Sequence, residues 1–275
     1  MLGHLLNLGE TPYLEAWELQ RSMAAQVLEG ALPDTVILLE HSPVVTLGRR
    51  AEAGELHVPD GAEVEIVETD RGGKSTYHGP GQLVCYPILD LNRHGRDVKK
   101  YCRDLEEAVI GAVAPFGLEA TRIEGLTGVW LERAPSPYGT SLTSVPSGDS
   151  APSTAPRGER RQRRERSAEP GSARLEASAA RSAGPPRKIA SIGVHISRWV
   201  TTHGYALNVD LDPAPFTDWI TACGIEDAAF TTIAREVGRS VTVDEVRPHA
   251  AAALEEVFGL QLREPVLAVG DAARR

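Results

Sequence analysis

Cysteine is scarce in this chain of 275 residues, which contains only Cys85, Cys102 and Cys223. Three scattered cysteines cannot build a disulfide framework, and their spacing matches no zinc motif, so no metal site is expected. The sequence also lacks an apolar run long enough to cross a membrane. Its first residues, MLGHLLNLGE, show neither a basic leader nor an extended apolar segment, so we expect no signal peptide. These absences predict a reducing, cytoplasmic location and no membrane partner.

Two common nucleotide-binding motifs are absent as well. No G-x-G-x-x-G opens a helix, and Lys74 does not follow the glycine spacing of a phosphate-binding P-loop. We therefore expect no cofactor. The remaining composition, with 41% hydrophobic residues and a formal net charge of −9, is that of an ordinary globular protein. The length of 275 residues suffices for one large domain or two small ones.

One segment, at about 134–186, differs in composition from the rest. Serine, alanine, proline, glycine and arginine dominate it and large apolar residues are almost absent, so it cannot bury enough surface to offset its ordering entropy. We interpret 1–275 as a single domain interrupted by this disordered insertion, since loop insertions cost little closure entropy. Its arginine cluster, RGERRQRRER, has no interleaved aromatic residues, which favours a solvated linker over a nucleic-acid site.

Helical and strand patterns occur in runs outside the insertion. Three helices are expected, over 12–28, 97–116 and 242–259, with Asp97 as a cap and Thr242 and Glu245 as a capping box. Strand patterns cover 35–40, 44–48, 64–70, 82–88, 128–132, 188–196 and 205–211. Runs rather than strict alternation predict an α+β fold, with helices packed on a mixed or antiparallel sheet.

A glycine-rich segment, RGGKSTYHGPGQ, begins at Arg71 and leads into a strand. A turn needs one or two glycines, whereas this segment has four. Its backbone therefore either bends twice or packs closely against a ligand or another part of the protein. The residue types suit two interpretations, an elaborate hairpin loop or the wall of a site. Lys74, Tyr77 and His78 on the same loop favour the second.

Two later segments have a similar character. KIASIGVHISRWVTTHGYALNV, from Lys188 to Val209, combines glycines with basic and aromatic residues. In ACGI, Cys223 precedes a glycine in a short break, which predicts an accessible thiol. Cys85 lies in a strand pattern and Cys102 in a helix pattern, so both are expected to be small packed or surface residues.

Together, the segments RGGKSTYHGPGQLVCYPILDL, EHSPVVTLGR, KIASIGVHISRWVTTHGYALNV and ACGI resemble the lipoyl(octanoyl) transferase family. The resemblance covers nearly the whole chain outside the insertion. It implies the α+β catalytic domain shared with biotin and lipoate protein ligases. It also implies an acyltransferase of lipoate biosynthesis that takes octanoyl from octanoyl-acyl carrier protein as a cysteine thioester. The implied acceptors are lipoyl domains of 2-oxoacid dehydrogenase complexes and the glycine cleavage H protein.

The resemblance assigns roles to individual residues. It implies that Cys223 is the nucleophile and that Lys188 lowers the pKa of its thiol. It implies an acyl-binding site built from three segments: Arg71, Gly72, Gly73, Lys74, Ser75, Thr76, Tyr77 and His78; Ser191, Ile192 and Gly193; and Gly204, Tyr205 and Ala206. The chain departs from the family at Ala222, where proline is usual, and at Phe230-Thr231-Thr232, where the family has Val-Thr-Ser.

Further expectations concern the residues around this chemistry. Oxyanion donors are expected from the amides of 72–73 or 191–193, and the walls of an apolar slot from Tyr77, Leu83 and Ile192. His78, His195 and His203 are interpreted mainly as structural histidines. The basic pairs Arg49-Arg50 and Lys99-Lys100 are expected to be solvated surface residues or contacts for an acidic partner.

Three alternatives remain open from the sequence. An ATP-dependent lipoate or biotin ligase would share the fold and would not need Cys223. A non-catalytic module would bind acylated carrier protein. A cysteine thioesterase would release the acyl group to water.

Overall fold

The computed structural model describes residues 1–52, 54–132, 185–220 and 229–265. Almost all of the predicted insertion, and Cys223, lie outside these ranges. The described residues before and after the insertion belong to one compact unit, which comprises Met1–Glu132 and Pro185–Arg275.

A mixed sheet forms the centre of this unit. Its strands in the described part of the chain are β1 (Leu2–Thr11), β2 (Thr35–His41), β6 (Gln82–Ile88), β7 (Ala120–Thr121), β8 (Val129–Leu131), β9 (Arg187–Ser197), β10 (Val200–Asn208), β11 (Ala229–Phe230) and β12 (Gln261–Arg263). They follow the order β12-β1-β2-β6-β10-β9-β8-β7, and β11 pairs with β9. β1 is parallel to β2 and β12, whereas the pairs from β2 to β7 are antiparallel. The predicted α+β class with a mixed sheet is confirmed.

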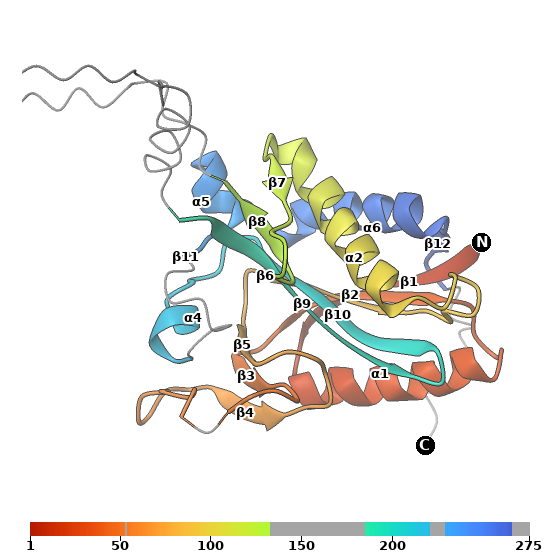
Figure 1. Ribbon diagram of the computed structural model, residues 1–275, viewed down its shortest axis with the longest axis horizontal. Helices are drawn as coiled ribbons and strands as arrows, with labels where there is room; N and C mark the ends of the chain where they lie inside the picture. Colours follow the sequence, from red (N-terminus) through yellow and green to blue (C-terminus); the bar gives the residue numbers. More distant parts are fainter. Residues whose placement is uncertain (53, 133–184, 221–228, 266–275) are drawn as a thin grey trace, which may run out of the picture. The chain divides into compact units, whose positions relative to one another are not determined.

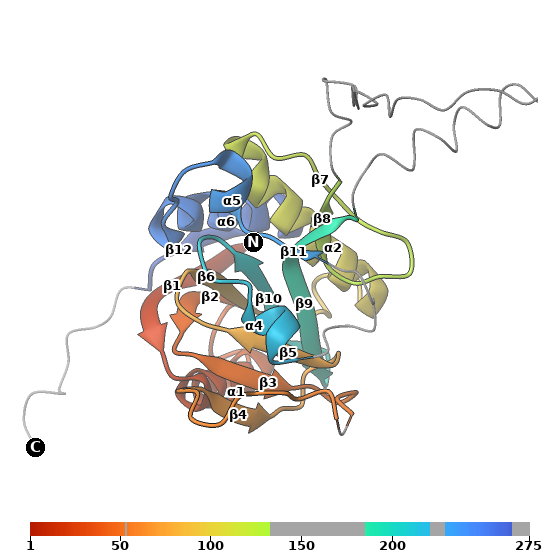
Figure 2. The same cartoon turned by 90° about the vertical axis from the view of Figure 1, so that its left-hand side faces the viewer.

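Helices cover both faces of the sheet (Figure 1). α1 (Tyr13–Leu28) lies on one face, and α2 (Val98–Val113) and α6 (Val243–Phe258) pack together on the other, as the turned view also shows (Figure 2). Shorter helices are η1 (Ala114–Phe116), α4 (Pro215–Asp218) and α5 (Ile233–Val237). None of the helices in the described ranges combines the length and apolar character that a membrane span requires.

Local capping signals set the starts of α2 and α6, as the sequence predicts. The Asp97 side chain accepts the Lys100 N–H at the start of α2. At the start of α6, Thr242 and Glu245 form the predicted capping box. Such caps satisfy backbone N–H groups that have no partner within the helix.

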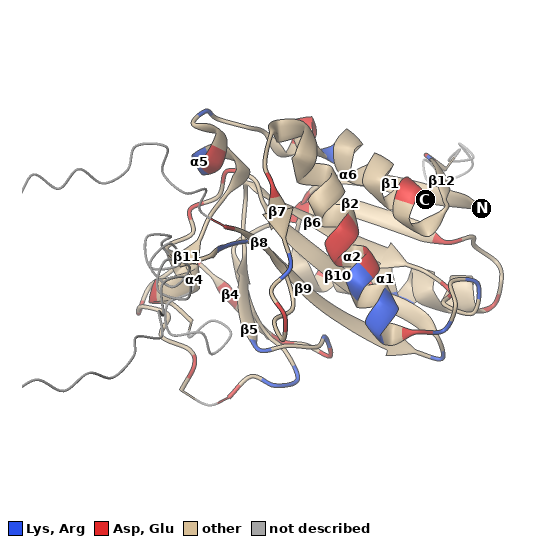
Figure 3. Cartoon of the chain, turned by 45° about the horizontal axis from the view of Figure 1, so that its top comes forward, with Lys and Arg blue, Asp and Glu red and all other residues tan. Residues whose placement is uncertain are grey.

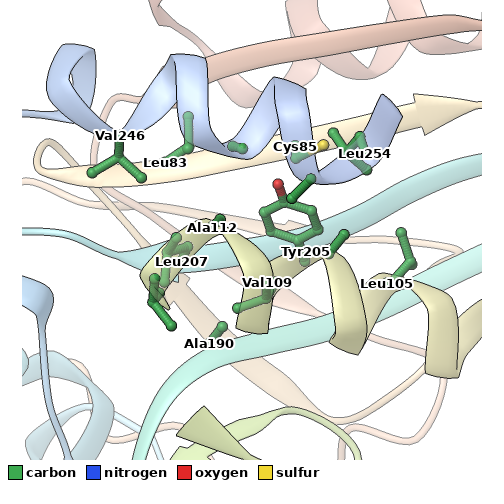
Figure 4. Close-up of a cluster of buried hydrophobic side chains, with 14 of the residues drawn as sticks. Leu83, Cys85, Leu105, Val109, Ala112, Ala190, Tyr205, Leu207, Val246 and Leu254 are labelled. Carbon is green, nitrogen blue, oxygen red and sulfur yellow. The ribbon is translucent and has the colours of Figure 1, made fainter. Parts of the chain in front are cut away.

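Alternation along β6 supplies two cores. Leu83 and Cys85 face α2 and α6, together with Tyr205 and Leu207 of β10 (Figure 4), whereas Val84 and Tyr86 face α1. Every residue of β6 is buried, as expected for a strand covered on both faces. The interpretation of Cys85 as a packed residue is confirmed.

A small second sheet lies beside the glycine segment. It joins β3 (Val44–Leu47), β4 (Glu65–Glu68) and β5 (Ser75–His78) in the order β4-β3-β5. The sequence patterns did not predict β5 or β1, and the interpretation of the whole glycine segment as loop was wrong in this respect. Both strands depend on pairing with distant strands, which local residue preferences do not reveal.

Candidate active site

A cavity of about 400 Å³ opens between the sheet, the glycine segment and the loop before β8. This volume lies within the usual range for small-molecule sites, about 300–1,000 Å³. Its lining includes most of the residues expected for acyl binding: Arg71, Gly72, Gly73, Lys74, Ser75, Thr76, His78, Ser191, Ile192, Gly193, Gly204, Tyr205 and Ala206. The glycine segment therefore meets the β9–β10 hairpin, which lies far from it in the chain and carries the other two segments, at one cavity.

Lys188 is also part of the cavity lining. Its residue is only 3% exposed, and Nζ lies 5.3 Å from the centroid of the Trp130 ring. The backbone around it is held by Thr231, whose N–H donates to the Lys188 carbonyl at 3.0 Å. A buried amine beside an aromatic face suits a role at a reacting thiol. Its expected partner Cys223 lies outside the described residues.

Arg71 ties the glycine segment to β3. Its Nε and Nη2 atoms donate to Thr46 Oγ1 at 3.1 and 2.8 Å, and Nη2 also donates to the Thr46 carbonyl at 2.6 Å. Nη1 donates to the Gly72 carbonyl at 3.0 Å. The guanidinium therefore fixes the start of the cavity wall through several charge-assisted hydrogen bonds.

The glycines of this wall allow neighbouring backbones to approach closely. The Gly72 N–H donates to the Val194 carbonyl at 2.9 Å, and a Cβ on Gly193 would stand 2.9 Å from the Gly72 carbonyl oxygen. The glycine segment is thus packed directly against β9. Because the Gly72 amide already donates within the protein, the expected oxyanion donors narrow to Gly73 and residues 191–193.

His78 links this wall to a buried amide. Its Nδ1 lies 2.7 Å from Gln82 Oε1, and Nε2 lies 3.5 Å from Thr46 Oγ1. Burial lowers the pKa of His78 well below its ordinary value, so the ring is neutral, with Nδ1–H donating to the amide oxygen. These contacts support the structural interpretation of His78.

The hydrogen bonds continue from Gln82 toward Lys188. Gln82 Nε2 donates to Asn208 Oδ1 at 3.0 Å, and Asn208 Nδ2 donates to the Thr231 carbonyl at 3.0 Å. Thr231 in turn holds the Lys188 backbone. A continuous buried network therefore connects the glycine segment to the strand that carries the lysine.

His203 forms a second polar contact in the cavity wall. Nε2 lies 2.7 Å from Asp70 Oδ1, and the backbone N–H donates to Gln20 Oε1 at 2.7 Å. The residue has a φ of +58°, an uncommon conformation for a non-glycine residue. His195 lies 3.7 Å from the same carboxylate. Asp70 thus orients His203 through a short hydrogen bond, whereas His195 is only a charged neighbour of the carboxylate when it is protonated.

The sequence interpretation missed the aromatic part of the cavity. Tyr13 and Tyr86 line it, and the Tyr13 ring stacks on His78 with centroids 6.1 Å apart. Tyr86 Oη lies 2.6 Å from Nε2 of His41, whose Nδ1 lies 2.8 Å from the Thr11 carbonyl. Tyr13 and Trp130 gave no pattern signal beyond being aromatic residues in a chain with few of them.

Other expected residues lie elsewhere. The Tyr77 ring, on the same strand as His78, packs against Phe216 and Trp219 and is not among the residues of the cavity lining. Leu83 belongs to the core under α2 and α6. The expectation that these two form walls of the slot was wrong, because alternate residues of a strand face opposite sides. Ile192 does line the cavity.

Basic residues also occur in the glycine segment and at the start of α2. Lys74 pairs with Glu55, and with Glu52 at 3.2 Å. Lys99 and Lys100 are exposed at the start of α2, where basic and acidic side chains occur together (Figure 3). Lys100 pairs with Asp104 at 2.6 Å.

Comparison with known proteins identifies the family. Residues 12–255 match the model of the lipoyl protein ligase A/B catalytic domain. An octanoyltransferase of Mycobacterium tuberculosis is 43% identical over 96% of this chain and 89% of its own length. Octanoyltransferases of Geobacter sulfurreducens and Chloroflexus aurantiacus are 39% and 38% identical, over 90% and 95% of this chain and 81% and 96% of their own lengths.

Solved structures agree in fold. A bipartite lipoate protein ligase from Thermoplasma acidophilum superposes with a TM-score of 0.60 at 16% identity, over 96% of this chain and 87% of the other. A lipoate-protein ligase A bound with ATP gives 0.59 at 17% identity, over 96% and 89%. The expected lipoate-ligase-like fold is confirmed, and the chain belongs to the lipoyl protein ligase A/B catalytic-domain family, within its octanoyltransferases, which are acyltransferases.

Proposed function

We propose that this chain transfers an octanoyl group from octanoyl-acyl carrier protein to the lysine amine of a lipoyl domain, through a thioester on Cys223. The observation that carries the proposal is the position of Lys188, a buried amine in the wall of a cavity that the three glycine-containing segments also line. The octanoyltransferase relatives support the reaction type.

In the first step, the Cys223 thiolate attacks the carbonyl carbon of the donor thioester. The new S–C bond forms as the C–S bond of the donor breaks, and the carrier's thiolate leaves and takes the proton of the Lys188 ammonium, which becomes neutral. The Lys188 ammonium favours the thiolate by its charge. Because one thioester replaces another, this step is nearly isoenergetic.

In the second step, the acceptor lysine amine attacks the acyl-enzyme, and the Cys223 thiolate leaves. Neutral Lys188 accepts the proton from the incoming amine. Formation of the amide drives the step, so ATP is not required. Amides of Gly73 or of residues 191–193 stabilise the oxyanion of each tetrahedral intermediate.

The proposed partners are an acyl carrier protein as donor and lipoyl domains as acceptors. We assign the acceptors to 2-oxoacid dehydrogenase complexes and the glycine cleavage H protein. The exposed Lys99 and the basic pair Arg49 and Arg50 supply positive charge that an acidic carrier can contact.

Intact-protein mass spectrometry tests the proposal directly. The purified chain is mixed with octanoyl-acyl carrier protein without ATP, beside Cys223→Ala. We expect an octanoyl adduct on the wild-type chain only, and its discharge when a lipoyl domain is added. No adduct, together with lipoyl modification that needs ATP and free octanoate, would instead identify a ligase. Release of free octanoate with lipoyl domain in excess would identify a thioesterase.

A further inference from the structure

Glu106 of α2 carries a buried carboxylate that has no role in the transfer reaction proposed above. Its Oε2 atom lies 2.7 Å from Nη1 of Arg103 and 3.3 Å from Nε of Arg122. Both arginines are partly exposed, with 51% and 32% of their side chains accessible. These charges offset the cost of burying a carboxylate, and these two contacts are to Oε2.

The other oxygen holds a loop of the cavity wall. Glu106 Oε1 accepts the backbone N–H of Gly128 at 3.1 Å, in a buried environment. Gly128 is the last residue before β8 and has a φ of +128°, a conformation that favours glycine. Residues 125–127, immediately before it, line the cavity.

Gly128 lies directly against the Lys188 side chain. A Cβ built on Gly128 would stand 2.7 Å from Lys188 Cε and 3.4 Å from Nζ, and also 2.7 Å from the Ala190 carbonyl oxygen. The Trp130 ring, two residues further along, also lies near the amine. The lysine stem is therefore packed against the peptide whose N–H Glu106 accepts.

We propose that Glu106 is a positioning residue for Lys188. By accepting the Gly128 N–H, its carboxylate fixes the backbone against which the lysine packs, and this holds the amine in the cavity wall. The inference rests on the proposed function, because its effect is exerted through the role of Lys188. A small displacement of a group in an active site is enough to slow a reaction strongly.

The test compares four variants of the full chain. Glu106→Leu removes the acceptor, Glu106→Gln keeps an oxygen that can accept the Gly128 N–H, Lys188→Met removes the amine, and Asp104→Asn is a control for a carboxylate on the same helix that pairs with Lys100. Two quantities are measured: the single-turnover rate of octanoyl-enzyme formation at several donor concentrations, and the rate of Cys223 alkylation by iodoacetamide as a function of pH.

Glu106→Leu is expected to slow acylation about tenfold at saturating donor, with the half-saturating donor concentration changed less than about twofold. Its alkylation profile should shift toward higher pH, in the direction of Lys188→Met. The acylation rate of Glu106→Gln should stay within about threefold of the wild-type rate. Asp104→Asn should have the wild-type rate and alkylation profile. A lower melting temperature with unchanged rates in Glu106→Leu would show a purely structural role and overturn the inference. Equal losses in the Gln and Leu variants would also overturn it, because charge rather than hydrogen-bond acceptance would then matter.

Gly128→Ala provides a second variant that leaves Glu106 intact, in case Glu106→Leu does not fold. Its added Cβ must displace the lysine stem, so the same loss of rate and the same shift in alkylation are expected, and an unchanged profile would contradict the inference. The measurements distinguish a failure of this inference from a failure of the proposed function. If wild type forms no octanoyl adduct, the proposed function is wrong, whereas the alkylation profile still reports whether Glu106 acts on Lys188.

Discussion

Lys188 and Trp130 lie directly opposite each other on β9 and β8, and Nζ of the lysine is 5.3 Å from the centroid of the indole ring. The strand register alone places the pair, because residues opposite each other in an antiparallel ladder have neighbouring Cβ atoms. A cation over an indole face is stabilised by about 0.5–2 kcal/mol, most when it is desolvated. The sheet thus supplies both the buried position of the amine and a partner for its charge.

Replacing Trp130 should affect stability and acylation together. Because the side chain is fully buried, Trp130→Ala is expected to lower the free energy of unfolding by about 3–5 kcal/mol. It should also slow octanoyl-enzyme formation, since Lys188 loses the ring beside it. Urea unfolding and single-turnover acylation measure the two effects. Trp130→Phe keeps an aromatic face, and acylation as slow as in the alanine variant would contradict this account.

Gly204 should not tolerate a side chain. A Cβ there would stand 2.6 Å from Pro87 Cδ and closer still to the Cys85 carbonyl oxygen. Gly204→Ala is therefore expected to lower the free energy of unfolding by at least about 1–3 kcal/mol, the usual cost of overpacking. Gly9→Ala is the matched control on β1, because nothing lies within 4 Å of its added Cβ. Equal denaturation midpoints for the two variants would show that the close approach has no energetic consequence.

His41 should make stability depend on pH. Burial lowers the pKa of His41 from 6.5 to about 4. The unfolded chain therefore binds a proton at this site over a range in which the folded chain does not, and stability falls as pH drops from about 6.5 toward 4. The full difference corresponds to about 3 kcal/mol.

Urea unfolding at several pH values checks this prediction. His41→Gln removes the titrating group and should flatten the decline between about pH 6.5 and 4. His78 and His203 also have lowered pKa values because of burial, so part of the decline should remain. A decline identical to that of wild type would show that His41 does not contribute.

Asn208 should be essential to the buried network that joins the glycine segment to the Lys188 strand. Asn208→Ala removes the shorter of the two hydrogen bonds of Gln82 Nε2, which keeps only the Tyr77 carbonyl at 3.4 Å, and it removes the amide that donates to the Thr231 carbonyl. Each buried polar group that loses its partner costs about 1–3 kcal/mol. We expect a loss of about 2–4 kcal/mol in chemical denaturation. Asn7→Ala is the control, because that side chain is exposed and its hydrogen bond to Glu264 is long, at 3.4 Å. A similar small change in both variants would contradict the prediction.

Features governed by neighbouring residues were predictable from the sequence. The Asp97 cap and the Thr242–Glu245 box each depend on residues three positions apart, and both helices begin where predicted. The apolar patterns of β2 and β6 were also sufficient to identify these strands. The three acyl-binding segments were expected from their resemblance to a known family, and nearly all of their residues line the cavity.

By itself, then, the sequence determined the three long helices, most of the strands and the fold class, and its resemblance to a family pointed to the segments that line the cavity. Only the tertiary structure decided that β1 and β5 are strands, that Tyr77 turns away from the cavity, and that Glu106 reaches Gly128 behind Lys188. The physical reason is distance along the chain. Hydrogen bonds between strands and contacts between side chains join residues that no local pattern relates, so their geometry is fixed only when the sheet is assembled.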